Sequence, residues 1–206
     1  GISEANFLGK GQDVRVKLTV AEKATQLDLG FTEPYFLNKD IIVGYDAFKT
    51  NTTYADESSF DNNVVGAGFR LGYMVTDRTR HLWNYSYKEE SIEGIKSDAS
   101  EFINNQAGDY TTSAISHRLT YFGINDRFNP SKGSTWAISN KLAGLGGTVS
   151  FLKTDVKHSF FYSVSEDYVL STHIKGGYIF GYNDDKVKLK DRYFLGADSF
   201  PGFEIA

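Results

Sequence analysis

The chain has 206 residues and a mass of 23.0 kDa, enough for one all-β domain, and length alone gives no reason to divide it. It contains no cysteine, which excludes disulfides, thiolate metal sites and a cysteine nucleophile. The formal net charge is −4 with acidic and basic residues interspersed, so nucleic acid is not expected as a partner. No run of 18 apolar residues exists, which excludes a helical membrane span.

Aromatic residues are abundant and prolines are scarce, with 16 Phe, 13 Tyr and 3 Pro in the chain. Aromatic side chains favour pleated surfaces, whereas proline has no N–H to donate to a strand ladder. All three prolines, Pro34, Pro130 and Pro201, fall in predicted turns. This distribution is typical of an antiparallel sheet.

Alternation of apolar and polar residues predicts nine β-strands. It is clearest in Gln12–Val20, where every second side chain is apolar and would lie on one face of a strand. A second segment, from Gln26 to Thr32, repeats the pattern. The other predicted strands are Asp40–Asn51, Asn63–Val75, Arg80–Ile92, Tyr110–Asn125, Ser134–Ala143, Val149–Val164 and Tyr168–Gly181.

Three features of these strands favour a membrane barrel. Most have ten or more residues, close to the roughly 9–11 that cross a bilayer at a tilt. Short turns such as Thr76–Thr79 alternate with longer loops such as Glu93–Asp109, as at the two ends of outer-membrane barrels. Aromatic residues lie near strand ends, where barrels carry aromatic girdles. The alternative interpretation is that these are core aromatics of a soluble β-sandwich.

The titratable residues indicate neither catalysis nor a metal site. The four histidines lie on different predicted strands, with no i,i+4 pair and no cysteine partner: His81, His117, His158 and His173. Ser116 and His117 are adjacent in a strand, so their side chains should diverge and cannot form a nucleophile–base pair. We therefore expect no metal, no cofactor and no enzymatic activity.

Other local motifs have ordinary structural explanations. The acidic pairs Glu89–Glu90 and Asp184–Asp185 are sequence neighbours, and we expect solvated charges on opposite faces. Ala143–Thr148 (AGLGGT) lacks the lysine and the helix of a phosphate-binding loop, which indicates a flexible hairpin turn. Asp126–Gly133 contains Asn-Pro and a later glycine, which is turn chemistry.

Five stretches, in order along the chain, carry a resemblance to a known family. They are NFLGKGQ (Asn6–Gln12), FTEPYFL (Phe31–Leu37), FNPSKG (Phe128–Gly133), LAGLGG (Leu142–Gly147) and DRYFLGADSFPGFE (Asp191–Glu204). Together they resemble the barrel domain of the BamA family of outer-membrane assembly factors, over essentially the whole chain.

The resemblance implies an all-β fold, part of a sixteen-stranded antiparallel transmembrane β-barrel. Residues 1–206 would be a single partial barrel domain with about nine strands, the third to the eleventh of the family. The chain would begin at the turn after the second strand and end in the long sixth extracellular loop. The periplasmic POTRA domains that precede the family's barrel, and the remaining strands, would be absent from this chain.

The resemblance also implies roles for two groups of residues. The family's periplasmic turn motifs correspond to Asn6, Phe7, Leu8, Gly9, Glu33, Pro34, Tyr35, Phe36, Asn129, Pro130 and Gly133. In the family, the sixth loop folds back into the lumen and carries an Arg-Gly-Phe tip. Phe200, Gly202 and Phe203 match this tip, whereas Pro201 stands where the arginine would be. Because proline carries no charge and fixes φ at about −65°, either rigidity and aromatic packing replace the family's ion pair or the loop has diverged.

The implied function is insertion of β-barrel proteins into the bacterial outer membrane, as the core subunit of the assembly machinery. The implied partners are unfolded outer-membrane proteins, assembly-machinery lipoproteins and the lipid bilayer. In the family, a weakly closed seam between the first and last strands serves as a template, and neither seam strand is expected to be complete here. A two-partner secretion transporter, a porin-like channel and a soluble β-sandwich binding module are the alternatives.

Overall fold

The structure, a computed structural model, describes residues 1–53, 61–95 and 107–183. Within these ranges the chain forms ten β-strands and one short 3₁₀ helix. They are β1 (Ile2–Phe7), β2 (Gln12–Ala21), β3 (Ala24–Glu33), η1 (Phe36–Asn38), β4 (Ile41–Thr53), β5 (Asp61–Thr76), β6 (Thr79–Glu93), β7 (Gly108–Ile124), β8 (Gly133–Ala143), β9 (Phe151–Ser163) and β10 (Val169–Gly181). No helix in the described ranges has the length and apolar character needed to cross a membrane.

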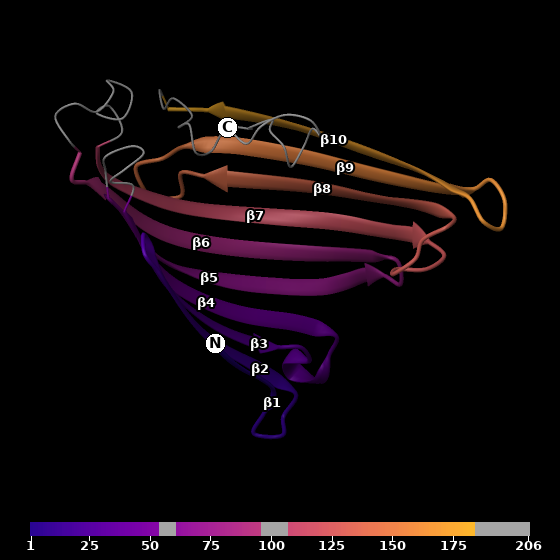
Figure 1. The fold of residues 1–206 in the computed structure, drawn as a ribbon, viewed down its shortest axis with the longest axis horizontal. Coiled ribbons are helices and arrows are strands. Elements are labelled where there is room, and N and C mark those ends of the chain that lie inside the picture. Colours follow the sequence, from indigo (N-terminus) through magenta and orange to yellow (C-terminus); the bar gives the residue numbers. More distant parts are fainter. Residues whose placement is uncertain (54–60, 96–106, 184–206) are drawn as a thin grey trace.

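The described strands form one curved sheet in which each strand pairs with the next along the chain (Figure 1). Every pairing is antiparallel. Among the described strands, β1 and β10 lie at the two ends of the sheet and have one neighbour each. Hairpin connections between consecutive strands produce this order. The predicted antiparallel all-β architecture is confirmed.

The sequence prediction missed β1, so the described residues hold ten strands where nine were expected. β1 has six residues, and its register against β2 shifts between Glu4 and Phe7. So short a segment with a break in register shows too little alternation to be recognised, and the strongly alternating β2 supplies its partner. The other nine strands are confirmed with small differences at their ends; for example, β9 begins at Phe151 rather than Val149.

The two ends of the sheet carry different connections. The connections after β1, β3, β5, β7 and β9 are short and lie at one end, which we call the short-turn end (Figure 1). The connections after β4 and β6 lie at the opposite, long-loop end and include residues 54–60 and 96–106, outside the described ranges. The turn after β2, Glu22–Lys23, is a short connection at the long-loop end. The predicted asymmetry therefore holds for β4 to β7 but not for this hairpin, nor for the connection from β8 to β9, residues 144–150, which is no longer than the connection from β7 to β8, residues 125–132.

The two faces of the sheet differ in exposure and in chemistry. In β4, Tyr45, Ala47 and Lys49 are exposed, whereas Asp46 and Phe48 between them are half-buried. We call the side of Tyr45 the convex face and the side of Asp46 the concave face, since curvature crowds side chains on the inner side. One cross-strand row of the convex face is apolar on eight successive strands: Phe31, Tyr45, Phe69, Tyr85, Ile115, Leu142, Leu152 and Phe180. An apolar outside and a polar inside are the arrangement of a membrane barrel.

A small buried apolar cluster lies on the concave side at the long-loop end. It consists of Ala114, Ala143, Val149 and Phe151, with Tyr110 and Ile179 packed against it. The connection from β8 to β9 is tied to β7 there, because Gly144 and Thr148 donate backbone N–H groups to the carbonyls of Ser113 and Thr111 at 3.0 and 2.8 Å. The AGLGGT segment is thus a hairpin connection held by backbone hydrogen bonds.

Candidate functional site

The concave face of β3 to β5 carries an ion-pair network centred on Arg70. Arg70 donates from Nε to Asp46 Oδ2 at 2.5 Å and from Nη2 to Asp46 Oδ1 at 3.2 Å. Nη2 also lies 3.2 Å from Thr32 Oγ1, to which it donates. Arg15 lies farther away, with Nη2 3.8 Å from Asp46 Oδ1. The forked contact between Arg70 and Asp46 is the stronger one and joins β4 to β5, while the bond to Thr32 extends the network to β3.

Gly44 provides the space in which the Arg70 guanidinium lies. The two residues are directly opposite in the ladder between β4 and β5. A Cβ at position 44 would lie 2.7 Å from Arg70 Nη2, closer than real Cβ atoms approach a neighbour. The glycine therefore lets the charged group lie flat against the strand and keeps it within reach of Asp46.

A groove with several cationic side chains lies on the concave side of β6 to β9. Its volume is about 480 Å³, and its lining includes Arg118, Lys141, Lys153 and Asp155. Arg118 Nε donates to Ser139 Oγ at 2.9 Å. Lys141 Nζ lies 5.6 Å from the centre of the Phe151 ring, within cation–π range. This polar wall suits a water-filled lumen and would attract acidic groups.

Glu90 departs from the expectation of a solvated charge. As predicted, Glu89 and Glu90 face opposite sides of β6, but Glu89 is exposed and Glu90 is only 5% exposed. Lys88, on the same face, places Nζ 3.4 Å from Glu90 Oε2. The expected solvation of Glu90 was wrong because the curvature of the sheet buries concave side chains, which sequence adjacency does not reveal.

The first turn motif forms the connection between β1 and β2. Asn6 Oδ1 accepts the backbone N–H of Gly11 at 2.7 Å, and the Asn6 carbonyl accepts the N–H of Gly9 at 2.9 Å. Leu8 and Gly9 have left-handed backbone angles, with φ of 54° and 71°. Phe7 is the last residue of β1. In the structure, these residues hold a tight turn at the short-turn end.

The second turn motif closes β3 and leads into η1. Glu33 Oε1 accepts the backbone N–H of Tyr35 at 2.9 Å, across Pro34. Glu33 Oε2 accepts Gln12 Nε2 at 2.8 Å, which ties this turn to the start of β2. Tyr35 and Phe36 are exposed at the short-turn end. Rings in this position fit the interfacial girdle of a barrel.

Asn125, which the sequence analysis did not single out, organises the connection between β7 and β8. Its Oδ1 accepts the backbone N–H groups of Ser131 and Lys132 at 3.0 and 2.9 Å, and its Nδ2 donates to Ser131 Oγ at 2.9 Å. The predicted motif residues Asn129 and Pro130 lie within the loop that these bonds close. Asparagine is a common turn residue, so the signal was available in the sequence.

Asp126 stabilises the same loop in a pH-dependent way. Its Oδ1 accepts the backbone N–H groups of Asn129 and Phe128 at 2.8 and 2.7 Å, and these bonds lower the pKa of Asp126 below its ordinary value. A lowered pKa means that the stabilisation is present above the ordinary pKa and is lost as the pH falls through the folded-state value. We expect Asp126→Ala to lose less stability between pH 7 and pH 3 than the parent protein, in urea unfolding at each pH. An equal loss in both proteins would contradict this role.

Gly133 begins β8 in a backbone conformation that favours glycine. Its φ is +105°, in the left-handed half of the map. A Cβ at this position would overlap the carbonyl oxygen of Gly123 on the neighbouring strand β7. This predicted motif residue therefore has a steric requirement that the alternation pattern could not show.

His81 and His117, which the sequence places on separate strands, meet on the convex face. His81 Nε2 lies 3.3 Å from His117 Nδ1. The chain of contacts continues from His81 Nδ1 to the Tyr73 hydroxyl at 3.0 Å and from His117 Nε2 to Asn140 Nδ2 at 3.0 Å, and Thr154 Oγ1 donates to Asn140 Oδ1 at 2.7 Å. These polar groups satisfy one another, as polar groups facing lipid must. The register between strands creates the contact, so residue spacing could not predict it.

Ser116 and His117 point to opposite faces of β7, as predicted. Ser116 Oγ donates to the Asn84 carbonyl at 3.4 Å on the concave side, while His117 lies on the convex side. The two side chains therefore cannot act as a nucleophile and its base. In the part of the chain that the structure describes, no three His, Asp or Glu side chains are arranged to hold a metal ion.

Several predicted residues lie outside the described ranges. They are the tip residues Phe200, Pro201, Gly202 and Phe203 and the acidic pair Asp184–Asp185. The described site therefore consists of the concave wall, the turns at the short-turn end and the convex surface.

Residues 6–206 match the Omp85 superfamily domain. The chain belongs to the Omp85 superfamily. The predicted family resemblance is confirmed, and the sheet described above is part of an Omp85 barrel domain. Members are β-barrel membrane proteins of the bacterial or mitochondrial outer membrane, and the assembly factors among them are not enzymes.

Curated relatives of this Omp85 chain come from a bacterium and from a vertebrate. It is 30% identical over 193 residues to the outer membrane protein assembly factor BamA of Neorickettsia risticii, covering 93% of this chain and 26% of that protein. It is 25% identical over 207 residues to the sorting and assembly machinery component 50 homolog of Xenopus tropicalis, covering 100% of this chain and 44% of that protein. The chain thus spans less than half of either relative.

A solved structure agrees with the fold. The sheet matches the crystal structure of BamA from Haemophilus ducreyi lacking POTRA domains 1–3, with a TM-score of 0.76 and 20% sequence identity. The match covers 94% of this chain and 40% of that chain. At this identity the likeness concerns the fold alone.

Proposed function

We propose that the protein containing this chain folds and inserts β-barrel proteins into the bacterial outer membrane, as the barrel subunit of the assembly machinery. The observation that carries the proposal is the Omp85 match over residues 6–206, together with relatives named as an outer membrane protein assembly factor and as a sorting and assembly machinery component. Its substrates would be unfolded outer-membrane proteins, and its other partners assembly-machinery lipoproteins and the surrounding bilayer. Residues 1–206 would be one partial barrel domain of that subunit.

The physical basis is the cost of an unpaired strand edge in lipid. Each unsatisfied backbone polar group in hydrocarbon costs several kcal/mol, so a strand enters the membrane readily only if it is already paired. A barrel whose own seam is weakly closed can offer that seam as a temporary partner. In this proposal the continuously paired wall from β2 to β10 is the fixed part, and the seam lies in strands beyond it.

We also propose that the segment Phe200–Phe203 acts as a lumenal loop in this machinery. Its support is the family tip motif, matched by Phe200, Gly202 and Phe203. Pro201 carries no charge, so any anchoring here would rest on aromatic packing and on the fixed φ of proline. The cationic groove beside Phe151 and the network around Arg70 are parts of the wall that such a loop would face.

Depletion of the complete protein in its own cells tests the proposed function. We expect the folded amounts of many unrelated outer-membrane barrel proteins to fall together, because all need a paired edge to enter the membrane. The measurement is the heat-dependent gel mobility of several such proteins, with restoration by the intact gene as the control. Loss of a single secreted partner, with other barrel proteins unchanged, would instead identify a two-partner secretion transporter.

A further inference from the structure

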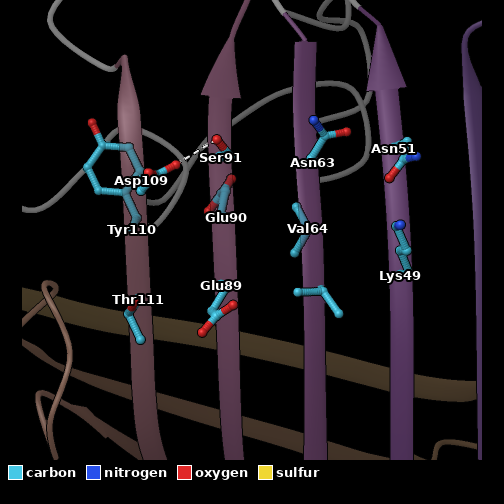
Figure 2. Close-up of a pocket in the computed structure, with 11 residues that line it drawn as sticks. Lys49, Asn51, Asn63, Val64, Glu89, Glu90, Ser91, Asp109, Tyr110 and Thr111 are labelled. Carbon is cyan, nitrogen blue, oxygen red and sulfur yellow. Dashed lines mark hydrogen bonds between the residues drawn. The ribbon is translucent and has the colours of Figure 1, made fainter.

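The convex face has a pocket that carries charged side chains at the long-loop end of β4 to β7. Its volume is about 480 Å³, and its lining includes Lys49, Asn51, Asn63, Glu89 and Asp109 (Figure 2). The alternation of the strands identifies the side on which it opens. Eight of its eleven lining residues, Lys49 and Asn51 among them, have side chains on the convex face, whereas those of Val64, Glu90 and Tyr110 face the other way. The pocket therefore opens toward the outside of the barrel, and we call it the convex pocket.

The position of the convex pocket along β5 places it at a membrane border. Tyr73 and Asn63 lie on the same face of β5, ten residues apart, which corresponds to about 33 Å along a strand. At the usual barrel tilt this distance becomes a height of about 25 Å, the height of the apolar band of an outer-membrane barrel. The residues of this face between them are all apolar: Val65, Ala67, Phe69 and Leu71. With Tyr73 at one border between lipid and water, the pocket beside Asn63 lies at the level of the lipid headgroups on the opposite side of the membrane.

The charges in the convex pocket are separated into two halves. On β4 and β5 it presents the Lys49 ammonium and the amides of Asn51 and Asn63, all on exposed residues. On β6 and β7 it presents the carboxylates of Glu89 and Asp109, also on exposed residues (Figure 2). Neighbouring strands are about 4.8 Å apart, so Lys49 on β4 and Glu89 on β6, two strands away, are roughly 10 Å apart before their side chains extend. One half suits an anion and the other a cation.

The acidic half is held in place by hydrogen bonds within the wall. Ser91 Oγ lies 2.6 Å from both Asp109 Oδ1 and Glu93 Oε1, between which its one proton is shared, and the Tyr87 hydroxyl donates to Glu89 Oε1 at 2.7 Å. A carboxylate has two oxygens and about four acceptor positions, so each bond leaves capacity for a further donor. Both carboxylates are thus fixed in orientation and can still accept an ammonium group.

We propose that the convex pocket binds the headgroup of a membrane phospholipid that carries both a phosphate and a primary ammonium, as phosphatidylethanolamine does. The phosphate would contact Lys49, with Asn51 and Asn63 donating from their amides. The ammonium would donate to Glu89 and Asp109, which a headgroup without N–H donors cannot do. The charges of the two halves complement those of such a headgroup, and the pocket lies at the level of the headgroups. Together these two features identify a lipid of the surrounding bilayer as the occupant. This inference is independent of the proposed assembly function.

Retention of lipids by the complete protein tests this proposal. The protein is reconstituted in vesicles of phosphatidylcholine with equal amounts of phosphatidylethanolamine and phosphatidylglycerol, then extracted mildly and analysed by native mass spectrometry. We expect about fivefold more phosphatidylethanolamine than phosphatidylglycerol to be retained, because only the former satisfies both halves. Lys49→Gln and Glu89→Gln should each abolish this preference, whereas Lys49→Arg should keep it. Lys132→Gln, in a turn at the short-turn end, is the matched control and should behave like the parent.

Each other outcome contradicts the proposal. Equal retention of the two lipids by the parent would mean that the acidic half contributes nothing. Retention of phosphatidylglycerol that rises to the same level when Mg²⁺ is added would mean that the carboxylates hold a bridging cation instead of an ammonium. An equal loss in Lys132→Gln would indicate general electrostatic attraction. Heat-dependent gel mobility confirms in each case that the variant barrel is folded.

Discussion

Replacing Gly133 with alanine is expected to destabilise the barrel by about 2–4 kcal/mol. The residue has a φ of +105°, and an added Cβ would overlap the carbonyl oxygen of Gly123 on β7. Because the clashing atom belongs to the backbone, no side-chain rotation relieves the overlap. The residue pair Ile124 and Gly133, at the end of the ladder between β7 and β8, must therefore open. Urea unfolding of the complete protein in detergent or vesicles measures the effect.

Gly176→Ala is the matched control for this prediction. Gly176 lies in β10, and a Cβ there would meet no atom of the described residues within 4 Å. The same chemical change should therefore alter stability by less than about 1 kcal/mol. Similar effects at positions 133 and 176 would contradict the steric explanation.

Removal of the Asp46 carboxylate is expected to have the second largest effect, a loss of about 1–3 kcal/mol. Asp46→Ala leaves the half-buried Arg70 guanidinium without the two bonds that hold it at 2.5 and 3.2 Å. The Arg70 and Asp46 side chains are only 32% and 28% exposed, so water replaces those bonds incompletely. The measurement is again urea unfolding, with Arg70→Met and the double variant completing a mutant cycle.

Arg15→Ala provides the contrast within the same network. Arg15 is 56% exposed, and its Nη2 lies 3.8 Å from Asp46 Oδ1. An exposed pair at this distance contributes about 0–0.5 kcal/mol, so the variant should be close to the parent. A coupling energy near zero between Asp46 and Arg70, or a large effect at Arg15, would show that the network is not centred on Arg70.

The sequence predicts the parts of this fold that depend on local pattern. Alternation in segments such as Gln12–Val20 located nine strands, because a period of two is visible within one strand. β1 was missed because its six residues show too little alternation and form a strand by pairing with β2. The turn motifs were located from Gly, Pro and Asn, but the hydrogen bonds of Asn125 and Asp126 appear only when the loop closes.

The features that could not be predicted arise from register and curvature. His81 and His117 are 36 positions apart, and only the stagger between β6 and β7 brings them to 3.3 Å. Glu90 looks like its neighbour Glu89 in the sequence, yet it is buried because it lies on the concave face. The convex pocket combines four strands, so its two charged halves are recognisable only when the strands lie side by side.

Labelling of introduced cysteines tests most directly the central claim that the concave face lines water and the convex face contacts lipid. The chain contains no cysteine, so single substitutions report one position each. In a cysteine-free background of the complete protein in vesicles, Ser116→Cys and Ser86→Cys on the concave face should react rapidly with a charged maleimide. Ile115→Cys and Ala67→Cys on the convex face should react only after denaturation. Equal reaction on both faces, or faster reaction at positions 67 and 115, would contradict the account.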